Sequence, residues 1–168
     1  MRWTLLFLAI GLALCLTRFA HAQGAADSLA ALCPSRQALA PLVEAAAHSA
    51  RVPAVVLVAM ARVESTCDPS AVNRRTGALG WLQVLPGRSA DPDHLDADEL
   101  ADPAVNIGLG ARHLRRCIDL CGTWPAGLHV FHGGKKCKEW RGDRYVKRVL
   151  GYVAQVRRWL AMQAVKVS

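Results

Sequence analysis

The sequence predicts a mainly α-helical protein with a single domain. Its 168 residues are enough for one domain with a proper core and too few for two. Apolar residues recur at helical spacing along most of the chain, while prolines begin the predicted helices and glycines or prolines end them. The chain has no convincing strand alternation, no internal repeat and no low-complexity tract. We therefore expect helices packed around one core, with at most a small hairpin.

Residues 1–22 have the pattern of a secretory signal peptide. Arg2 precedes an apolar run over residues 5–16, and an Ala-His-Ala cleavage site of the small-x-small kind follows. The run is too short for a comfortable membrane span, and no later segment is apolar enough for one. We expect an exported protein in which residues 23–40 form an N-terminal segment before the domain, with a loose N-terminus over residues 23–33. Cleavage of the signal, an uncleaved anchor and a lipid at Cys15 remain alternatives.

The mature chain is predicted to be basic. The full sequence has 21 Lys and Arg against 13 Asp and Glu, and removal of the signal peptide takes away Arg2 and Arg18 but no acid, which leaves 19 against 13 and a net charge of +6. Such a charge suits an anionic partner, namely a cell-wall polymer, a membrane surface or a nucleic acid, and it also serves solubility alone. Export and the lack of interleaved aromatic and basic residues argue against nucleic acid.

Five cysteines follow the signal peptide. In an oxidising compartment this number predicts two disulfides and one leftover thiol. We expect Cys33 to pair with Cys67, and Cys137 to pair with Cys121 or Cys117, which share a helix face. No Cys-x-x-Cys or His-rich spacing occurs, so we expect no metal cluster.

The first two helices are predicted in close succession. One runs from about residue 41 to residue 50. Pro53 begins the next, which ends near Ser65 and is apolar until its last turn. Since Arg62 is its only charge before Glu64, this second helix should be buried nearly all round.

The middle of the chain changes from irregular to helical. Residues 66–101 are rich in Gly and Pro, so we expect loops with short helices or a small hairpin. Residues 102–121 form the clearest helix, because Asp102 can cap it, Pro103 lies in its first turn and Gly122 stops it.

Two further helices are predicted at the C-terminal end. Pro125 begins a short helix that reaches Phe131, a loop of Gly and Lys covers residues 133–142, and the last helix runs from residue 143 to about residue 165. Five apolar residues of this last helix are expected to face inward: Val146, Val149, Val153, Val156 and Leu160.

Glu64 is the candidate catalytic residue, because it is an acid on an apolar helix face, four residues after Met60 and seven after Leu57. Burial and the negative end of the helix dipole both disfavour the carboxylate and so raise the pKa. A carboxylic acid kept neutral in this way can act as a general acid in glycosidic cleavage. A structural ion pair with Arg62 or Arg112 is the alternative.

Three blocks of sequence carry a family resemblance, in the family's order and at its spacing. They are VPAVVLVAMARVESTCDPSAVN, with Glu-Ser before an Asp-Pro turn; GALGWLQVLP, against Gly-Ala-x-Gly-Leu-Met-Gln-x-x-Pro; and DPAVNIGLGARHL, with Asn-Ile-x-x-Gly. With a weaker C-terminal block they cover about residues 40–156 and resemble the catalytic domain of the soluble lytic transglycosylases, which are bacterial cell-wall enzymes. The resemblance implies a lysozyme-like, goose-type helical domain over residues 41–168.

The resemblance also implies roles for individual residues. Glu64 would be the catalytic acid and base, and Ser65 would hydrogen-bond and orient it. Gln83 would line the cleft and contact the sugar. Trp81 stands where the family usually has Leu, and is either core or a surface that stacks on a sugar. Tyr145 matches a tyrosine whose hydroxyl approaches the catalytic Glu.

The segment HVFHGG departs from the family's usual Ala-Tyr-Asn-x-Gly, since Phe131 replaces Tyr and His132 replaces Asn. Phe cannot donate a hydrogen bond, so a cleft contact is lost or is transferred to His132 or Tyr145. We interpret His132 as a substitute polar residue of the cleft and keep Phe131 as a candidate substrate-binding residue. Asn106 of the third block is interpreted as structural.

A second catalytic carboxylate is not evident. Asp68 is the nearest acid in sequence, but it precedes Pro69 in a turn, where capping is its expected role. Glycosidases usually employ two carboxylates, yet one suffices if the substrate supplies the nucleophile. The resemblance implies that Glu64 protonates the oxygen between N-acetylmuramic acid and N-acetylglucosamine and then deprotonates the muramyl C6 hydroxyl, which closes a 1,6-anhydro ring. No cofactor or metal is implied.

The expected partners are peptidoglycan glycan strands and an envelope-spanning secretion, conjugation or pilus machine, in the bacterial periplasm or outside the cell. We expect no nucleic acid partner and no stable membrane insertion after signal cleavage. A muramidase of the same fold that uses water is one alternative. A non-catalytic or weakly active wall-binding accessory domain is another, prompted by Phe131 and His132.

Overall fold

The structure is a computed structural model that describes residues 24–87 and 94–167. The predicted signal peptide lies outside the described residues. Residues 24–32 are helical. The remaining elements are η1 (Pro34–Leu39), α2 (Ala40–Ala50), α3 (Ala54–Glu64), α4 (Ala97–Ala101), α5 (Pro103–Cys121), α6 (Trp124–Phe131), η2 (Cys137–Gly142) and α7 (Arg144–Val167), where η denotes a 3₁₀ helix.

The irregular middle segment contains almost no regular pairing. Within the described parts of the chain no β-strand forms, and two isolated antiparallel bridges join Leu79 to Val72 and to Val84. The expected mainly α fold with at most a small hairpin is therefore confirmed. No single described helix is long and apolar enough to cross a membrane, although the bent pair Pro34–Ala50 and Ala54–Glu64 passes on length and composition together.

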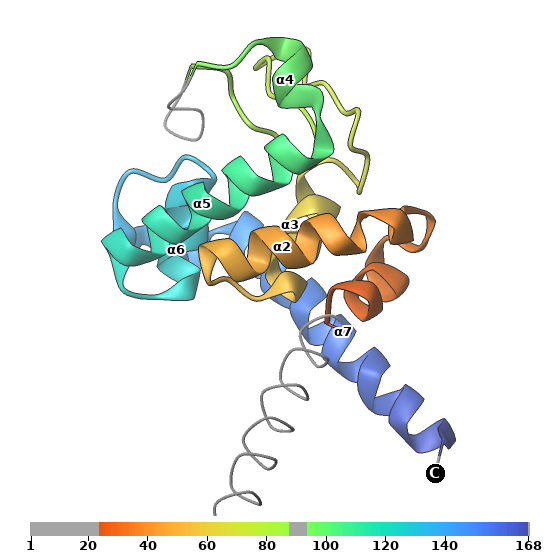
Figure 1. The fold of residues 1–168 in the computed structure, drawn as a ribbon. Helices are drawn as coiled ribbons and strands as arrows, with labels where there is room; N and C mark the ends of the chain where they lie inside the picture. The colour runs from red at the N-terminus through yellow and green to blue at the C-terminus, as the bar shows by residue number, and fades with distance from the viewer. Residues whose placement is uncertain (1–23, 88–93, 168) are drawn as a thin grey trace, which may run out of the picture.

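The core is centred on α3, as its apolar sequence predicts. All but a few of its residues are buried, and it packs against α2 and α7, while α5 packs against α2 and α6 (Figure 1). The predicted helix at residues 102–121 is also confirmed as α5. Asp102 caps it, as expected, by accepting hydrogen bonds from the backbone N–H groups of Ala104 and Val105. These packed helices fix where α3 ends, and so where Glu64 lies.

Two expectations about the ends of the domain are wrong. The start of the chain is helical over residues 24–32 rather than loose, because Ala25, Leu29 and Leu32 are buried in the core. Leu160 does not face inward but is 36% exposed, since the last turns of α7 project beyond the body of the molecule (Figure 1). The other four inward-facing residues of that helix are buried, as predicted.

The cysteines pair within the range expected. Cys33 bonds to Cys67, and Cys137 bonds to Cys121 rather than to Cys117, which remains a buried free thiol. The first disulfide joins the N-terminal segment to the turn that follows α3. It therefore ties the buried start of the chain to the region of Glu64.

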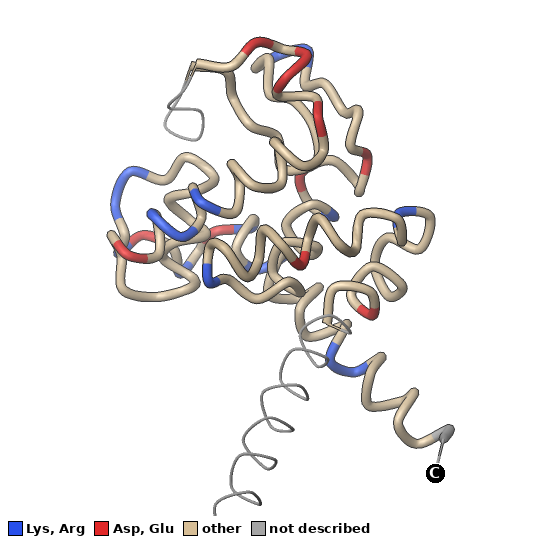
Figure 2. Tube along the Cα trace, in the orientation of Figure 1, with Lys and Arg blue, Asp and Glu red and all other residues tan. Residues whose placement is uncertain are grey.

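Charge is distributed unevenly over the domain. Acidic residues gather around α4, and basic residues lie toward the C-terminal end of α5 (Figure 2).

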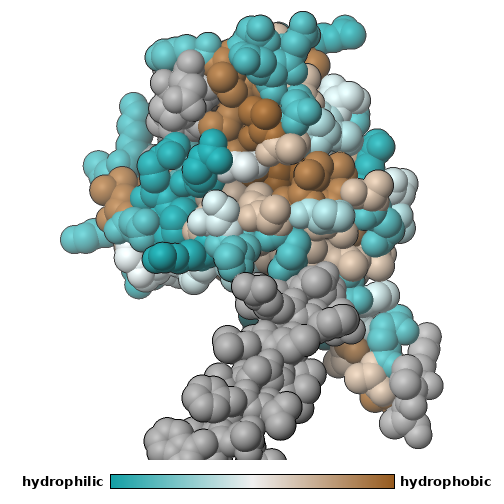
Figure 3. All heavy atoms as spheres, in the orientation of Figure 1, coloured by the Kyte–Doolittle hydropathy of each residue, from teal (hydrophilic) through white to brown (hydrophobic). Residues whose placement is uncertain are grey.

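Two hollows of about 190 and 590 Å³ lie beside α5 and share Ser49 and Arg112. Figure 3 shows the face of α2 and α5, where apolar surface borders a hydrophilic area. Neither hollow is lined by Glu64.

Candidate active site

Glu64 is the last residue of α3, and its side chain is only 12% exposed. Burial raises the pKa of Glu64 from 4.5 to about 7, and the lowering effects of Tyr145 and Arg148 do not offset it. Among the described residues, no Lys or Arg lies within ion-pair distance of this carboxyl. The alternative of a structural ion pair with Arg62 or Arg112 is therefore wrong, and a carboxyl with this pKa can both donate and accept a proton near neutral pH.

Tyr145, in the first turn of α7, lies against the acid. The residue is buried, and its hydroxyl has no well-aligned hydrogen-bond partner among the described residues. The hydroxyl is nevertheless close enough to the Glu64 carboxyl for each group to shift the pKa of the other. Burial, with the Glu64 charge, raises the pKa of Tyr145 well above its ordinary value. The hydroxyl therefore stays protonated and can donate a hydrogen bond to a carboxylate.

His132, at the end of α6, covers the Tyr145 ring. The two rings are stacked with their centroids 4.1 Å apart and an interplanar angle of 2°. Nδ1 of His132 is 3.9 Å from Oε1 of Glu64, and the His132 side chain is 52% exposed. Burial lowers the pKa of His132, although Asp143 raises it. The imidazole is therefore neutral at neutral pH, and its contact with Glu64 is not an ion pair there.

The start of α7 is anchored by Asp143 and His129, which the sequence analysis missed as parts of the site. One Asp143 oxygen accepts a hydrogen bond from the backbone N–H of Tyr145 at 2.7 Å, and the other lies 2.5 Å from Nδ1 of His129. Burial alone would raise the pKa of Asp143, but these hydrogen bonds lower it overall. An Asp just before a helix is the signal that could have identified this cap.

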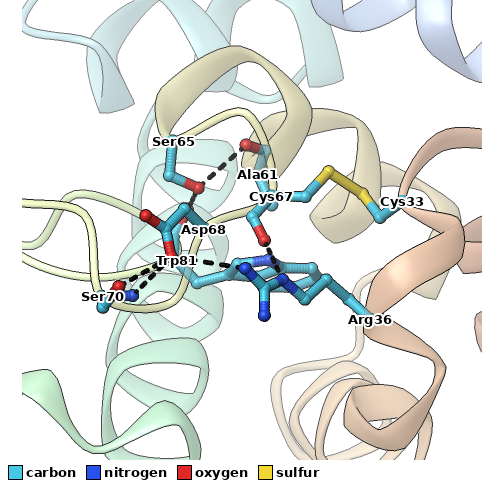
Figure 4. Close-up of polar contacts among 8 residues, drawn as sticks. All are labelled: Cys33, Arg36, Ala61, Ser65, Cys67, Asp68, Ser70 and Trp81. Carbon is cyan, nitrogen blue, oxygen red and sulfur yellow. Dashed lines mark hydrogen bonds and ion pairs between the residues drawn. A yellow bond between two sulfur atoms is a disulfide. The ribbon is translucent and has the colours of Figure 1, made fainter.

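Ser65 does not make the bond to Glu64 that the resemblance implied. Its hydroxyl donates to the carbonyl oxygens of Ala61 at 3.2 Å and Trp81 at 3.0 Å (Figure 4). Ser65 directly follows the last turn of α3, so its hydroxyl reaches a helix carbonyl and a loop carbonyl and bonds to these instead of to the Glu64 carboxyl. Ser65 thus joins α3 to the loop that carries Trp81.

The second sequence block forms a loop beside α5. Trp81 is fully buried, so it belongs to the core and does not offer a face to a sugar in this conformation. The Gln83 amide donates to the carbonyl oxygens of Ala71 at 3.3 Å and Gly80 at 3.0 Å, and the side chain is half-buried. Gln83 therefore stabilises its own loop, and its predicted contact with a sugar stays a prediction.

Asn106 confirms its structural interpretation. Its side chain is fully buried, accepts a hydrogen bond from the N–H of Leu82 and donates to the carbonyl oxygens of Leu79 and Leu100, each at 2.9 Å. Gly80 has a φ of +72° and lies so close to the Asn106 amide that a Cβ would overlap it. One side chain of α5 thus holds the loop at Leu79 and Leu82.

Phe131 and Asp68 take no visible part in the chemistry. Phe131 is half-buried, with its ring centroid 5.2 Å from that of His113. Asp68 accepts hydrogen bonds from the backbone and hydroxyl of Ser70 and lies 3.5 Å from Arg36 (Figure 4). This confirms the capping role of Asp68. Within the described residues, no group of three or more His, Cys, Asp or Glu side chains is placed to hold a metal ion.

Comparisons with known proteins agree with this geometry. The family model described as the transglycosylase SLT domain matches residues 41–149. Among solved structures, the 70-kDa soluble lytic transglycosylase in complex with bulgecin A superposes with a TM-score of 0.60 at 23% identity, over 71% of this chain and 24% of that chain. The chain thus corresponds to about a quarter of that protein. None of the curated proteins matches it. The expected lysozyme-like helical fold is confirmed.

Proposed function

The chain belongs to the family of transglycosylase SLT domains, and from this premise we propose that it is a peptidoglycan lytic transglycosylase. It cleaves the β-1,4 bond between N-acetylmuramic acid and N-acetylglucosamine and leaves a 1,6-anhydro muramyl product. The observation that carries this proposal is the state of Glu64, which is buried at a helix end with its pKa raised to about 7. Such a group can serve first as acid and then as base.

The reaction needs only one protein carboxylate. Glu64 protonates the glycosidic oxygen, and the muramyl C6 hydroxyl then attacks the anomeric carbon of its own sugar. Attack within one sugar needs no bound water, and a well-oriented intramolecular reaction can gain several orders of magnitude in rate. Tyr145 stabilises the carboxylate after proton loss, because its protonated hydroxyl lies beside it. Gln83 and Phe131 bind the glycan, and His132 lies beside the reacting sugar.

The proposed place of action is the bacterial envelope, in the periplasm or outside the cell. Two disulfides support it, since such bonds persist in oxidising compartments, and so does the signal-peptide pattern. The basic mature chain favours encounter with the anionic wall. We further propose that the enzyme opens the wall locally for a secretion, conjugation or pilus machine.

Muropeptide analysis tests the activity. Purified sacculi are digested with wild type and with Glu64→Gln, and the soluble products are identified by mass spectrometry. We expect 1,6-anhydro products from the wild type and a loss of at least about 10³-fold in Glu64→Gln, because the amide cannot transfer the proton. Reducing ends would indicate a muramidase instead. Binding to sacculi without soluble product would indicate a wall-binding domain.

A further inference from the structure

His132 places a second titratable group beside the acid. In the family this position is typically Asn, whereas here an imidazole lies flat on the Tyr145 ring. Its Nδ1 is 3.9 Å from Oε1 of Glu64. Tyr145 therefore contacts both groups, since its hydroxyl lies beside the Glu64 carboxyl and its ring stacks on the His132 imidazole.

The two groups differ in their access to solvent. The Glu64 side chain is 12% exposed, whereas the His132 side chain is 52% exposed. Stacking on Tyr145 holds the imidazole in one plane next to the carboxyl. About half of the side chain stays open, so a bound glycan can reach the ring.

We propose that His132 is a second proton-transfer group that takes over the role of base from Glu64, so that Glu64 acts as the acid and His132 deprotonates the substrate hydroxyl. This rests on the proposed transglycosylase activity. Glu64 gives its proton to the glycosidic oxygen as the bond from that oxygen to muramyl C1 breaks, and the electron pair stays on the oxygen. The C6 hydroxyl loses its proton to His132 as the C6 oxygen bonds to C1. The imidazolium then returns this proton to the Glu64 carboxylate, which restores both side chains.

The protonation states suit this division of work. Burial raises the pKa of Glu64 to about 7 and lowers the pKa of His132, so near neutral pH a neutral imidazole faces a carboxyl of which a substantial share is protonated. A neutral imidazole has one N–H and one lone-pair nitrogen and can therefore both accept and release a proton. The 3.9 Å separation exceeds a hydrogen bond, but catalytic contacts in unliganded sites are often long and tighten with substrate.

The other charged groups around the ring do not replace it as base. Asp143 raises the pKa of His132, and His129 and Arg148 lower it. Asp143 is occupied by His129 and by the backbone of Tyr145, and Arg148 carries no lone pair that could accept a proton. His132 is thus the group that faces both Glu64 and the solvent side.

Two substitutions separate proton transfer from stacking. His132→Phe keeps an aromatic ring on Tyr145 without nitrogen atoms, and His132→Asn restores the family's typical residue. The release of anhydro product from a defined glycan is measured between about pH 4.5 and 8.5. In the wild type we expect the rate to fall above about pH 7, where Glu64 ionises, and again at low pH, where His132 becomes charged. Both variants should lose the low-pH limb, with kcat about 10²-fold lower and KM within about twofold.

Chemical rescue provides a measurement within a single folded variant. In His132→Ala, free imidazole can occupy the vacated space on Tyr145. We expect it to raise kcat at least about tenfold at neutral pH, where much of it is neutral. Glu64→Gln is the matched control, because it keeps His132 but lacks the acid, and imidazole should not rescue it.

Several results would overturn the role of His132. Full activity in His132→Phe would show that only stacking matters, and a raised KM with unchanged kcat would make His132 a binding residue. A failure of imidazole to rescue folded His132→Ala would exclude proton transfer. A wild type without any anhydro product would instead overturn the proposed function, and the role of His132 with it.

Discussion

The two sides of the site are built by different forces. On one side, α3 and α7 bring Glu64 and Tyr145 together through apolar residues that are buried between the helices. On the other side, residues 71–84 have almost no regular structure and are held by hydrogen bonds from a few polar side chains. The helical side sets the electrostatics of the acid through burial. The loop side sets the shape next to it and is the side on which substitutions can act locally.

The largest effect on stability is expected on the helical side. Leu57 of α3 is fully buried, so Leu57→Ala removes apolar contacts and leaves a cavity. We expect a loss of about 3 to 4 kcal/mol in the free energy of unfolding, measured by urea denaturation. Met60→Leu, which conserves volume at a neighbouring buried position, is the matched control and should lose less than about 1.5 kcal/mol.

The second prediction concerns the cost of burying the acid. Since the pKa of Glu64 is raised from 4.5 in the unfolded chain to about 7 in the folded protein, the folded state binds the proton more tightly. The contribution of Glu64 to stability is therefore greatest below about pH 4.5 and is lost as the pH rises to about 7. This amounts to about 3 kcal/mol.

Glu64→Gln isolates that contribution. Its free energy of unfolding should exceed that of the wild type above pH 7, and the difference should shrink steadily toward acidic pH. Parallel denaturant titrations of both proteins between about pH 4 and 8 measure it. A constant difference across this range would mean that Glu64 is not desolvated in the folded protein.

A smaller and more local effect is expected on the loop side. Asn106→Ala leaves the N–H of Leu82 and the carbonyl group of Leu100 without their side-chain partner. It also removes one of the two hydrogen bonds that the Leu79 carbonyl accepts, while the bond from the N–H of Val84 remains. We expect a loss of about 2 kcal/mol, with faster hydrogen exchange over residues 71–84 and unchanged protection in α3. Equal loss of protection in α3 would show that both sides unfold as one unit, against the contrast drawn above.

Much of the fold follows from local patterns in the sequence. The apolar run before Glu64 predicts a buried helix, and Asp102 with Pro103 predicts the start of α5, because caps and periodicity depend on neighbours in sequence. The direction of the Glu64 pKa shift also follows, since an acid on an apolar helix face must lose water when the helix packs.

Other features depend on contacts between distant parts of the chain. Periodicity allowed both Cys117 and Cys121 to reach Cys137, and packing selected Cys121. Likewise, an aromatic in place of Leu at Trp81 was compatible with core or surface, and the closing of the loop onto α5 buried it. The stack of His132 on Tyr145 joins α6 to α7, and no local rule specifies such a pair.

The sequence alone therefore establishes the helices, their buried faces and the acid that one of them carries, because these properties repeat at short range along the chain. The assembled molecule adds the surroundings of that acid: Tyr145 beside it, His132 above the tyrosine, and Ser65 turned toward Trp81 instead. These neighbours come from separate segments, and their positions result from how the helices pack around one shared core.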